Sequence, residues 1–253
     1  MKPLLEALAE RPLLADGAMG TQLQVAGLAA GKCGEEWNLA HPDRVLAIHK
    51  SYADAGSDCL FTQTFGASEI NLQRHGLAGS SEAINRAGVE LARRAFGNRP
   101  GYVFGDMGPF GGLLRPFGKT TADEARAAFQ RQAESLVAAG VDAIVIETQT
   151  SLEELALAIA AAREAGAACI IASLAFDVLR SGKDARTMMG VTPERAAKFI
   201  QAAGAHVAGT NCGKDVDIAW AAKILARYRQ ACELPLLAKP NAGAPVFENG
   251  RPV

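Results

Sequence analysis

Polar side chains end nearly every apolar run of this 253-residue sequence. Carboxylates, amides, hydroxyls and thiols at such positions can bind a ligand or a metal ion, and in parallel α/β folds they collect where strands end and loops begin. For any single residue, the simpler interpretation is that it marks the limit of burial, but the whole set predicts an active site. The residues are Asp16, Thr62, Gln63, Thr64, Asp106, Glu147, Gln149, Asn211, Cys212, Lys239 and Asn241.

Two features of this set predict an amino-acid ligand. Glu147 directly follows the apolar residues AIVI (143–146), and a carboxylate at the mouth of an apolar core requires a cationic partner such as a substrate amine. The first bend, DGAMGTQL (16–23), offers backbone N–H groups between two glycines, and such groups can hold a carboxylate. Together they indicate a ligand that carries both an amine and a carboxylate.

Cys212 lies in the motif GTNCG (209–213), beyond the apolar part of its predicted strand. A thiol at this point could be a nucleophile or a zinc ligand. His206 begins the same predicted strand and so belongs at its opposite end, which leaves no histidine placed to act as a base for the thiol. A zinc ligand is therefore the favoured role for Cys212.

A repeated unit positions these residues: a helix ends in Ala-Gly, and a strand follows within a few residues. The unit occurs at 55–65, 139–150, 165–176 and 203–212, and the runs 13–17, 102–108 and 234–241 also fit the strand role. Glycine supplies the left-handed cap of the helix, and the runs are apolar on both faces, as buried parallel strands are. Helical periodicity fills the segments between them; in one, Ser151 and Glu154 form a capping-box pattern.

Alternation of strand and helix without a linker predicts a single α/β domain over residues 1–253. A doubly wound sheet and a (β/α)8 TIM-type barrel both fit, but no GxGxxG turn follows the first strand, which favours the barrel. A barrel has eight strands and about 250 residues or more, whereas this sequence offers seven candidate strands. We therefore expect a barrel without its eighth strand–helix unit. Its first and seventh strands would be open edges that favour a homo-oligomer.

Composition excludes several classes of protein. Lysine and arginine (26) balance aspartate and glutamate (27) and are interspersed with them, which argues against nucleic acid or an anionic membrane as partner. No apolar run reaches the roughly 18 residues of a membrane span, and the charges in MKPLLEALAERPLL exclude a signal-peptide core. Five cysteines without a CxxC spacing do not indicate a secreted disulfide framework. These features predict a cytoplasmic protein.

Six motifs, in order along the chain, resemble the homocysteine-binding domain of the zinc-dependent homocysteine S-methyltransferases. The resemblance covers nearly the entire chain, from about residue 3 to about residue 245. The motifs are DGAMGTQLQ, WNLAHPDRVLAIHKSYADAGSDCLFTQTFGAS, GDMGPFGGLL, AGVDAIVIETQT, GTNCG and KPNAG. Within that family, WNL and SDCLFTQTFGAS are more similar to the cobalamin-dependent methionine synthase branch than to the betaine or S-methylmethionine branches.

The resemblance implies a barrel that binds homocysteine at the carboxyl ends of its strands. Asp16, Gly17 and the backbone of Ala18 and Met19 match the loop that receives the amino-acid end of the substrate. Glu147 matches the glutamate that meets the amine. Asn241 matches an asparagine of the binding site, and Asn211 is a further candidate for substrate binding. Cys212 matches the first of three zinc-binding thiolates. The substrate sulfur, held as a thiolate, would attack the methyl group of methylcobalamin carried by a partner corrinoid protein or domain, giving methionine.

One departure from the family concerns the metal. The family takes its other two zinc ligands from a Gly-Gly-Cys-Cys run at the end of the eighth strand, and this sequence stops at ENGRPV (248–253). We expect, in this order, a fragment of a longer protein, a short variant without the metal, or a barrel completed by a partner chain. Two other functions stay open: methyl transfer with another thiol or donor, such as S-methylmethionine or betaine, and a non-catalytic binding or scaffold subunit.

Overall fold

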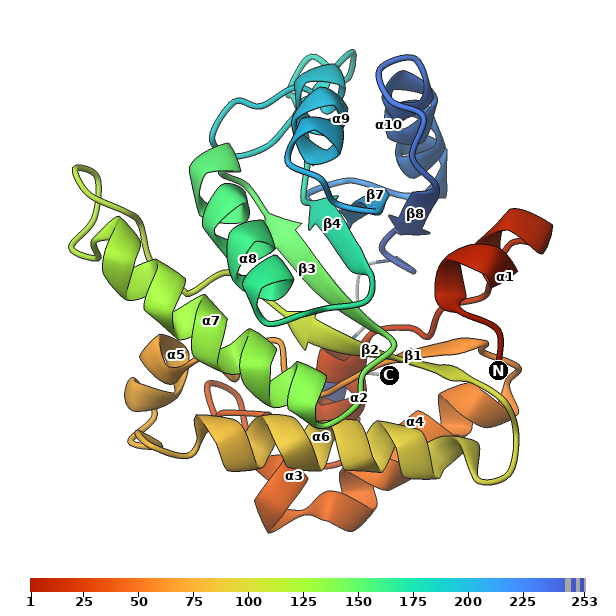
Figure 1. Cartoon of the computed structure of the whole chain (residues 1–253), viewed down its shortest axis with the longest axis vertical. Helices are drawn as coiled ribbons and strands as arrows, with labels where there is room; N and C mark the ends of the chain where they lie inside the picture. Colours follow the sequence, from red (N-terminus) through yellow and green to blue (C-terminus); the bar gives the residue numbers. More distant parts are fainter. Residues whose placement is uncertain (244–246, 249–250, 253) are drawn as a thin grey trace.

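The computed structural model describes residues 1–243, 247–248 and 251–252, and it is organised around one curled parallel sheet (Figure 1). The sheet has six strands in the order β1-β2-β3-β4-β7-β8, and every neighbouring pair runs parallel. Their carboxyl ends therefore lie along one edge. The strands are β1 (Cys59–Phe61), β2 (Tyr102–Met107), β3 (Ala143–Gln149), β4 (Ile170–Leu174), β7 (Val207–Asn211) and β8 (Leu236–Lys239).

Helices connect the strands and cover the outer face of the sheet (Figure 1). The longer ones are α4 (Pro42–Asp54), α6 (Ser81–Phe96), α7 (Ala122–Ala138), α8 (Leu152–Glu164), α9 (Pro193–Ala202) and α10 (Ile218–Arg229). The short ones are α1 (Leu4–Glu10), α2 (Met19–Val25), α3 (Trp37–Ala40) and α5 (Glu69–Gln73). Two antiparallel strand pairs lie outside the sheet: β5 (Asp177–Val178) with β6 (Ala185–Arg186), and β9 (Phe247–Glu248) with β10 (Arg251–Pro252). Among the described helices, none is long and apolar enough to cross a bilayer.

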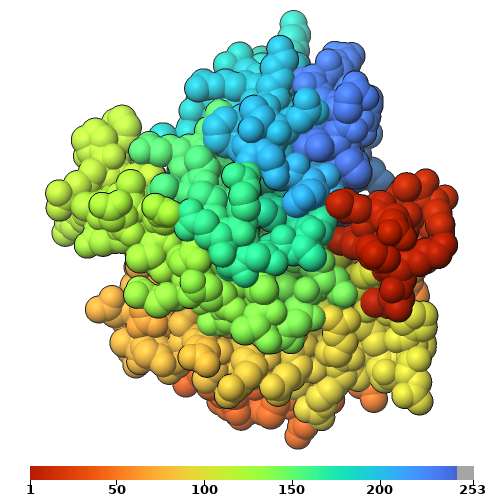
Figure 2. All heavy atoms as spheres, in the orientation of Figure 1, coloured from red at the N-terminus to blue at the C-terminus, as the bar shows by residue number. Residues whose placement is uncertain are grey.

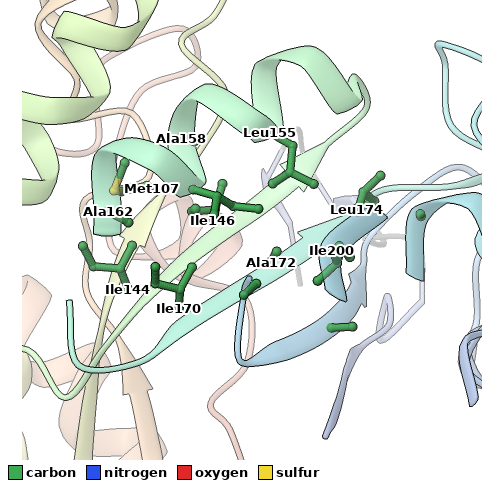
Figure 3. Packing of buried hydrophobic residues seen from close by; sticks show 14 of the residues in the cluster. Met107, Ile144, Ile146, Leu155, Ala158, Ala162, Ile170, Ala172, Leu174 and Ile200 are labelled. Carbon is green, nitrogen blue, oxygen red and sulfur yellow. The ribbon is translucent and has the colours of Figure 1, made fainter. Parts of the chain in front are cut away.

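The helices pack on the outer face through a continuous apolar cluster (Figure 3). Ile144 and Ile146 of β3 are fully buried beside α8, whose Leu155 and Ala158 are equally inaccessible. Full burial of an isoleucine or leucine side chain contributes about 1.5–3 kcal/mol to the free energy of unfolding. The helical periodicity predicted for 151–166 thus places the apolar stripe of α8 against β3 and β4.

A second apolar cluster lies on the inner face of the curl. Phe61, Phe104 and Val145 belong to it, one from each of the first three strands, because alternate side chains of a strand point to the same face. Helix α1 covers its amino end, with Leu4 buried in the cluster. In Figure 2 the N-terminal segment, coloured red, lies at the edge of the molecule beside the yellow and blue surfaces. The described interior is thus a packed core, and the polar side chains at the carboxyl ends of the strands lie above it.

The predicted first strand, 13–17, makes only an isolated bridge, between Ala15 and Cys59. The backbone N–H of Asp16 donates to the carbonyl of Cys59 at 3.0 Å, and Leu14 on the other side is 58% exposed. Among the described residues, β8 pairs only with β7. The structure is therefore a curled part-barrel that is open between 13–17 and β8. This confirms the predicted fold class, while the run 13–17 is shorter as a strand than predicted.

Candidate functional site

Four charged side chains lie in the layer directly above the inner apolar cluster. The spacing of two residues along each strand explains why: Phe104, Val145 and Leu237 face inward, and the residue two positions later on each strand is charged. We call these four residues the charged cluster: Asp16, Asp106, Glu147 and Lys239.

An ion pair within this cluster bridges the open side of the sheet. The Nζ atom of Lys239 lies 3.3 Å from Oδ1 of Asp16, so that the end of β8 meets the run 13–17. The other carboxylate oxygen of Asp16 accepts the backbone N–H of Phe61 at 2.9 Å. The ammonium also lies 3.5 Å from the centre of the Phe61 ring. The two partners differ in burial: the side chain of Asp16 is 3% exposed, whereas that of Lys239 is 19% exposed and keeps some contact with solvent.

Asp106 is the most unusual member of the cluster, because its carboxylate is buried and incompletely bonded. Its backbone N–H donates to the hydroxyl of Thr62 at 3.0 Å, and its carbonyl accepts from the hydroxyl of Thr64 at 2.7 Å, so its position is fixed. Its Oδ1 atom has no hydrogen-bond partner among the residues that the structure describes. Burial, followed by the neighbouring Glu147, raises the pKa of Asp106 well above its usual range. Such a group requires either a proton or a cation.

The cluster as a whole holds three carboxyl groups and one ammonium. Burial raises the pKa of Glu147, and also that of Asp16, while Lys239 opposes the rise at both. Burial lowers the pKa of Lys239, but the three carboxylates outweigh it, and the net pKa is raised. Lys239 is thus held as a cation. Because three carboxyl groups share this one ammonium, the cluster can balance the charge of a second cation.

Cys212 presents an exposed thiol next to this cluster. It follows β7 in the left-handed region, at φ 49°, and its N–H donates to the carbonyl of Lys239 at 3.1 Å. Burial raises the pKa of the thiol, and Glu147 adds to the rise, partly offset by the Asn211 side chain. Within the part of the chain that the structure describes, no three His, Cys, Asp or Glu side chains are grouped to hold a metal ion. These residues therefore do not fit a zinc site, for which Cys212 is a single ligand.

Asn211 is fully engaged with its own chain. Its Oδ1 accepts the N–H of Thr148 at 3.0 Å and the hydroxyl of Ser173 at 2.6 Å, and its Nδ2 donates to Oγ1 of Thr148 at 2.7 Å. Thr148 needs this support, because it has a left-handed φ of 59° and follows Glu147. Asn211 therefore fixes the backbone of Thr148, the residue that follows Glu147, and its predicted binding role stays a prediction.

Asn241 holds the loop that carries Cys212. Its Nδ2 donates to the carbonyl of Gly213 at 2.7 Å and to that of Val216 at 3.3 Å. Asn241 thus fixes the backbone next to the thiol, and its predicted binding role stays a prediction.

The glycine bend at 16–20 is shaped by an aromatic side chain. The hydroxyl of Tyr52 donates to the carbonyl of Ala18 at 2.8 Å. A Cβ atom on Gly17 would lie 2.8 Å from Cε1 of Tyr52, so any other residue here would require the Tyr52 ring to move. Met19 then begins α2, and its side chain packs against an apolar cluster. The bend leaves Ala18 exposed, and the predicted substrate loop is accessible.

Sequence reasoning assigned no binding role to Asp106 or Lys239, although both belong to the polar strand-end set. The signal that could have found them is the spacing of two residues from an inward-facing apolar side chain. Tyr52 and Ser173 carried no such signal, because their contacts join distant segments.

Comparisons with known proteins bear on this site. A family model described as homocysteine S-methyltransferase matches residues 13–252. The methionine synthase of Mycobacterium tuberculosis is 31% identical over 255 residues, which cover 96% of this chain and 21% of that protein. Betaine–homocysteine S-methyltransferase 1 of Bos taurus is 29% identical over 86% of this chain and 52% of its own length. The chain thus spans about a fifth of the methionine synthase.

Solved structures confirm the fold. The metallated form of the homocysteine methyltransferase MmuM from Escherichia coli superposes with a TM-score of 0.79 at 22% identity, and the match covers 96% of this chain and 88% of that one.

Proposed function

Because the chain belongs to the homocysteine S-methyltransferase family, we propose that it binds homocysteine at the carboxyl ends of its strands and presents the substrate sulfur for methylation to methionine. One observation carries this proposal: the charged cluster, which has room for a second cation, lies beside the exposed thiol of Cys212. The amine of an amino acid matches the charged cluster, and the sequence resemblance places the substrate sulfur beside Cys212.

The residues of the chain have distinct parts in this proposal. Glu147 takes the ammonium of the substrate, with Asp16 in the same layer. The bend at Gly17, Ala18 and Met19 offers backbone N–H groups to the carboxylate end. Asn211 and Asn241 hold the backbones of Thr148 and Gly213, the residues that follow Glu147 and Cys212. The substrate sulfur, directed toward Cys212, is the nucleophile that takes the methyl group.

Zinc and methylcobalamin enter the proposal through the sequence resemblance. The described residues do not group three ligands for zinc, so we derive no step through the metal. Methylcobalamin on a corrinoid protein or domain is the proposed methyl source. The choice of this donor over betaine rests on the motifs WNL and SDCLFTQTFGAS, which are more similar to the cobalamin-dependent methionine synthase branch.

Calorimetric titration with reduced L-homocysteine tests the binding step. The wild-type chain should bind it, and Glu147→Gln should weaken binding by roughly tenfold, because a charge-assisted hydrogen bond to the ammonium is replaced by a neutral one. Unchanged affinity in Glu147→Gln would contradict the assignment of this carboxylate to the amine.

Methionine formation tests the transfer step and identifies the donor. Methylcobalamin, S-methylmethionine and betaine are supplied in separate reactions, and the proposal expects turnover with methylcobalamin. The sequence resemblance makes Cys212 a zinc ligand, and on that basis Cys212→Ser should abolish that turnover. Homocysteine binding without turnover from any donor would instead identify a non-catalytic binding subunit.

A further inference from the structure

Lys239 lies beside the proposed substrate site and has no role in the proposed function so far. It ends β8, its backbone carbonyl accepts the N–H of Cys212, and its ammonium reaches across the open edge to Asp16. Its side chain is 19% exposed, so a ligand entering from the carboxyl ends of the strands can touch it. An ammonium has three donors, and Asp16 occupies one. The other two donors have no hydrogen-bond partner among the described residues, and the Phe61 ring lies on one side of the ammonium.

The charges around Lys239 indicate that its ammonium can bind an anionic group of a ligand. Lys239 is the basic side chain that acts on the pKa of Asp16, Asp106 and Glu147 alike. An amino-acid carboxylate placed among three carboxyl groups would be repelled unless a cation lies between them. Lys239 is adjacent to Asp16, which begins the bend with the backbone N–H groups, so it can supply this cation.

Asp106 has the complementary position. Its Oδ1 atom is buried and lacks a hydrogen-bond partner in the described part of the chain. The strand register pairs Asp106 with Val145, two residues before Glu147 on the same face, so both carboxylates face the same space. A ligand ammonium between them would complete the bonding of Asp106.

We propose that Lys239 binds the α-carboxylate of the substrate and that Asp106 joins Glu147 in binding its ammonium, so that the site selects a thiol carrying both groups on one carbon. This inference rests on the proposed function and deepens it. Lys239 and Asp106 are then specificity-determining residues, and each recognises one end of the zwitterion.

Three reduced thiols separate the two ends in a calorimetric test: L-homocysteine, 3-aminopropane-1-thiol, which lacks the carboxylate, and 4-mercaptobutanoic acid, which lacks the amine. For the wild-type chain, both truncated ligands should bind at least roughly tenfold more weakly than homocysteine, which corresponds to about 1.4 kcal/mol. Equal affinity for homocysteine and 3-aminopropane-1-thiol would overturn the role of Lys239 without any variant.

Two variants then assign the ends. Lys239→Met should weaken homocysteine and 4-mercaptobutanoic acid by roughly tenfold or more and leave 3-aminopropane-1-thiol unchanged or tighter. Asp106→Asn should weaken the two amine-containing ligands and spare 4-mercaptobutanoic acid. Lys198→Met, which removes an exposed lysine of α9, is the matched control and should change none of the affinities.

A purely structural role for Lys239 predicts a different pattern. Lys239→Met would then lower the unfolding temperature and weaken the binding of all three ligands alike, or of none of them. Either result overturns the inference, and homocysteine binding by the wild type would still support the proposed function. Failure of the wild-type chain to bind homocysteine would instead refute the proposed function, and the inference with it.

Discussion

His49 provides a direct test of the energetics inside this fold, because it is a titratable group in a fully buried position. It lies on α4 with no measurable exposure, and neither ring nitrogen has a hydrogen-bond partner among the described residues. Burial, followed by repulsion from Lys239, lowers the pKa of His49 to about 4. An imidazole in an unfolded chain titrates near pH 6.5, so the two states differ by about 2.5 units.

The consequence for stability follows from proton linkage. Between pH 6.5 and pH 4 the unfolded chain binds a proton at His49 that the folded chain does not bind, so the free energy of unfolding falls as the pH falls through this window. At 1.36 kcal/mol per unit, the full difference is about 3 kcal/mol. This contribution to stability is complete above pH 6.5 and lost once the pH falls through the folded pKa.

Urea unfolding of the wild type and His49→Leu, at half-unit steps from pH 4 to pH 8, measures the effect. The difference between the two free energies should be constant above pH 7 and should shift in favour of His49→Leu by about 3 kcal/mol at pH 4. Exposed His75, replaced by leucine, is the control and should leave the wild-type profile intact. Parallel curves for wild type and His49→Leu over the whole range would refute the assignment of a buried, neutral imidazole.

Three further expectations concern individual contacts. Asn211→Ala removes three hydrogen bonds and leaves the N–H of Thr148 without its acceptor; it should lower the free energy of unfolding by about 3 kcal/mol in urea and weaken homocysteine binding. Glu154 accepts the N–H of Phe110, and burial raises its pKa to about 7, so stability present below about pH 4.5 is lost as the pH rises through 7. In Glu154→Gln, the fall in the free energy of unfolding with rising pH should therefore be smaller by up to about 3 kcal/mol. If wild type and variant lose the same free energy of unfolding between pH 5 and pH 8, the prediction is wrong. Elemental analysis of the purified chain should find less than one zinc per chain, because the described residues group no further ligands with Cys212; one tightly held zinc would contradict this.

The alternation of strands and helices was predictable because each element carries its own signal. The apolar runs and the Ala-Gly helix ends depend on residues close together in the chain, and each of the six sheet strands lies within its predicted run. The run 13–17 has the same apolar signal but forms a single bridge. Strand formation requires partners, and the described structure gives this run one neighbour, β1.

Helix capping shows where local patterns stop being sufficient. Ser151 and Glu154 have the spacing of a capping box, and the hydroxyl of Ser151 does accept the N–H of Glu154. The carboxylate of Glu154 binds the N–H of Phe110 instead of returning to Ser151. That contact joins residues 44 positions apart, so no spacing rule predicts it. The complete reciprocal box occurs at Thr121 and Glu124.

The candidate site follows the same division between local and long-range information. Glu147 could be identified because its own strand places a carboxylate after four apolar residues. Lys239 could not be assigned in the same way, because its partner Asp16 lies 223 positions away and the contact exists only when the sheet curls. Ion pairs that are partly desolvated contribute little net stability, since the cost of burial offsets the attraction. Ligand binding therefore explains the Lys239–Asp16 pair better than stabilisation of the fold does. The affinities of the three thiols distinguish these two roles more sharply than an unfolding curve.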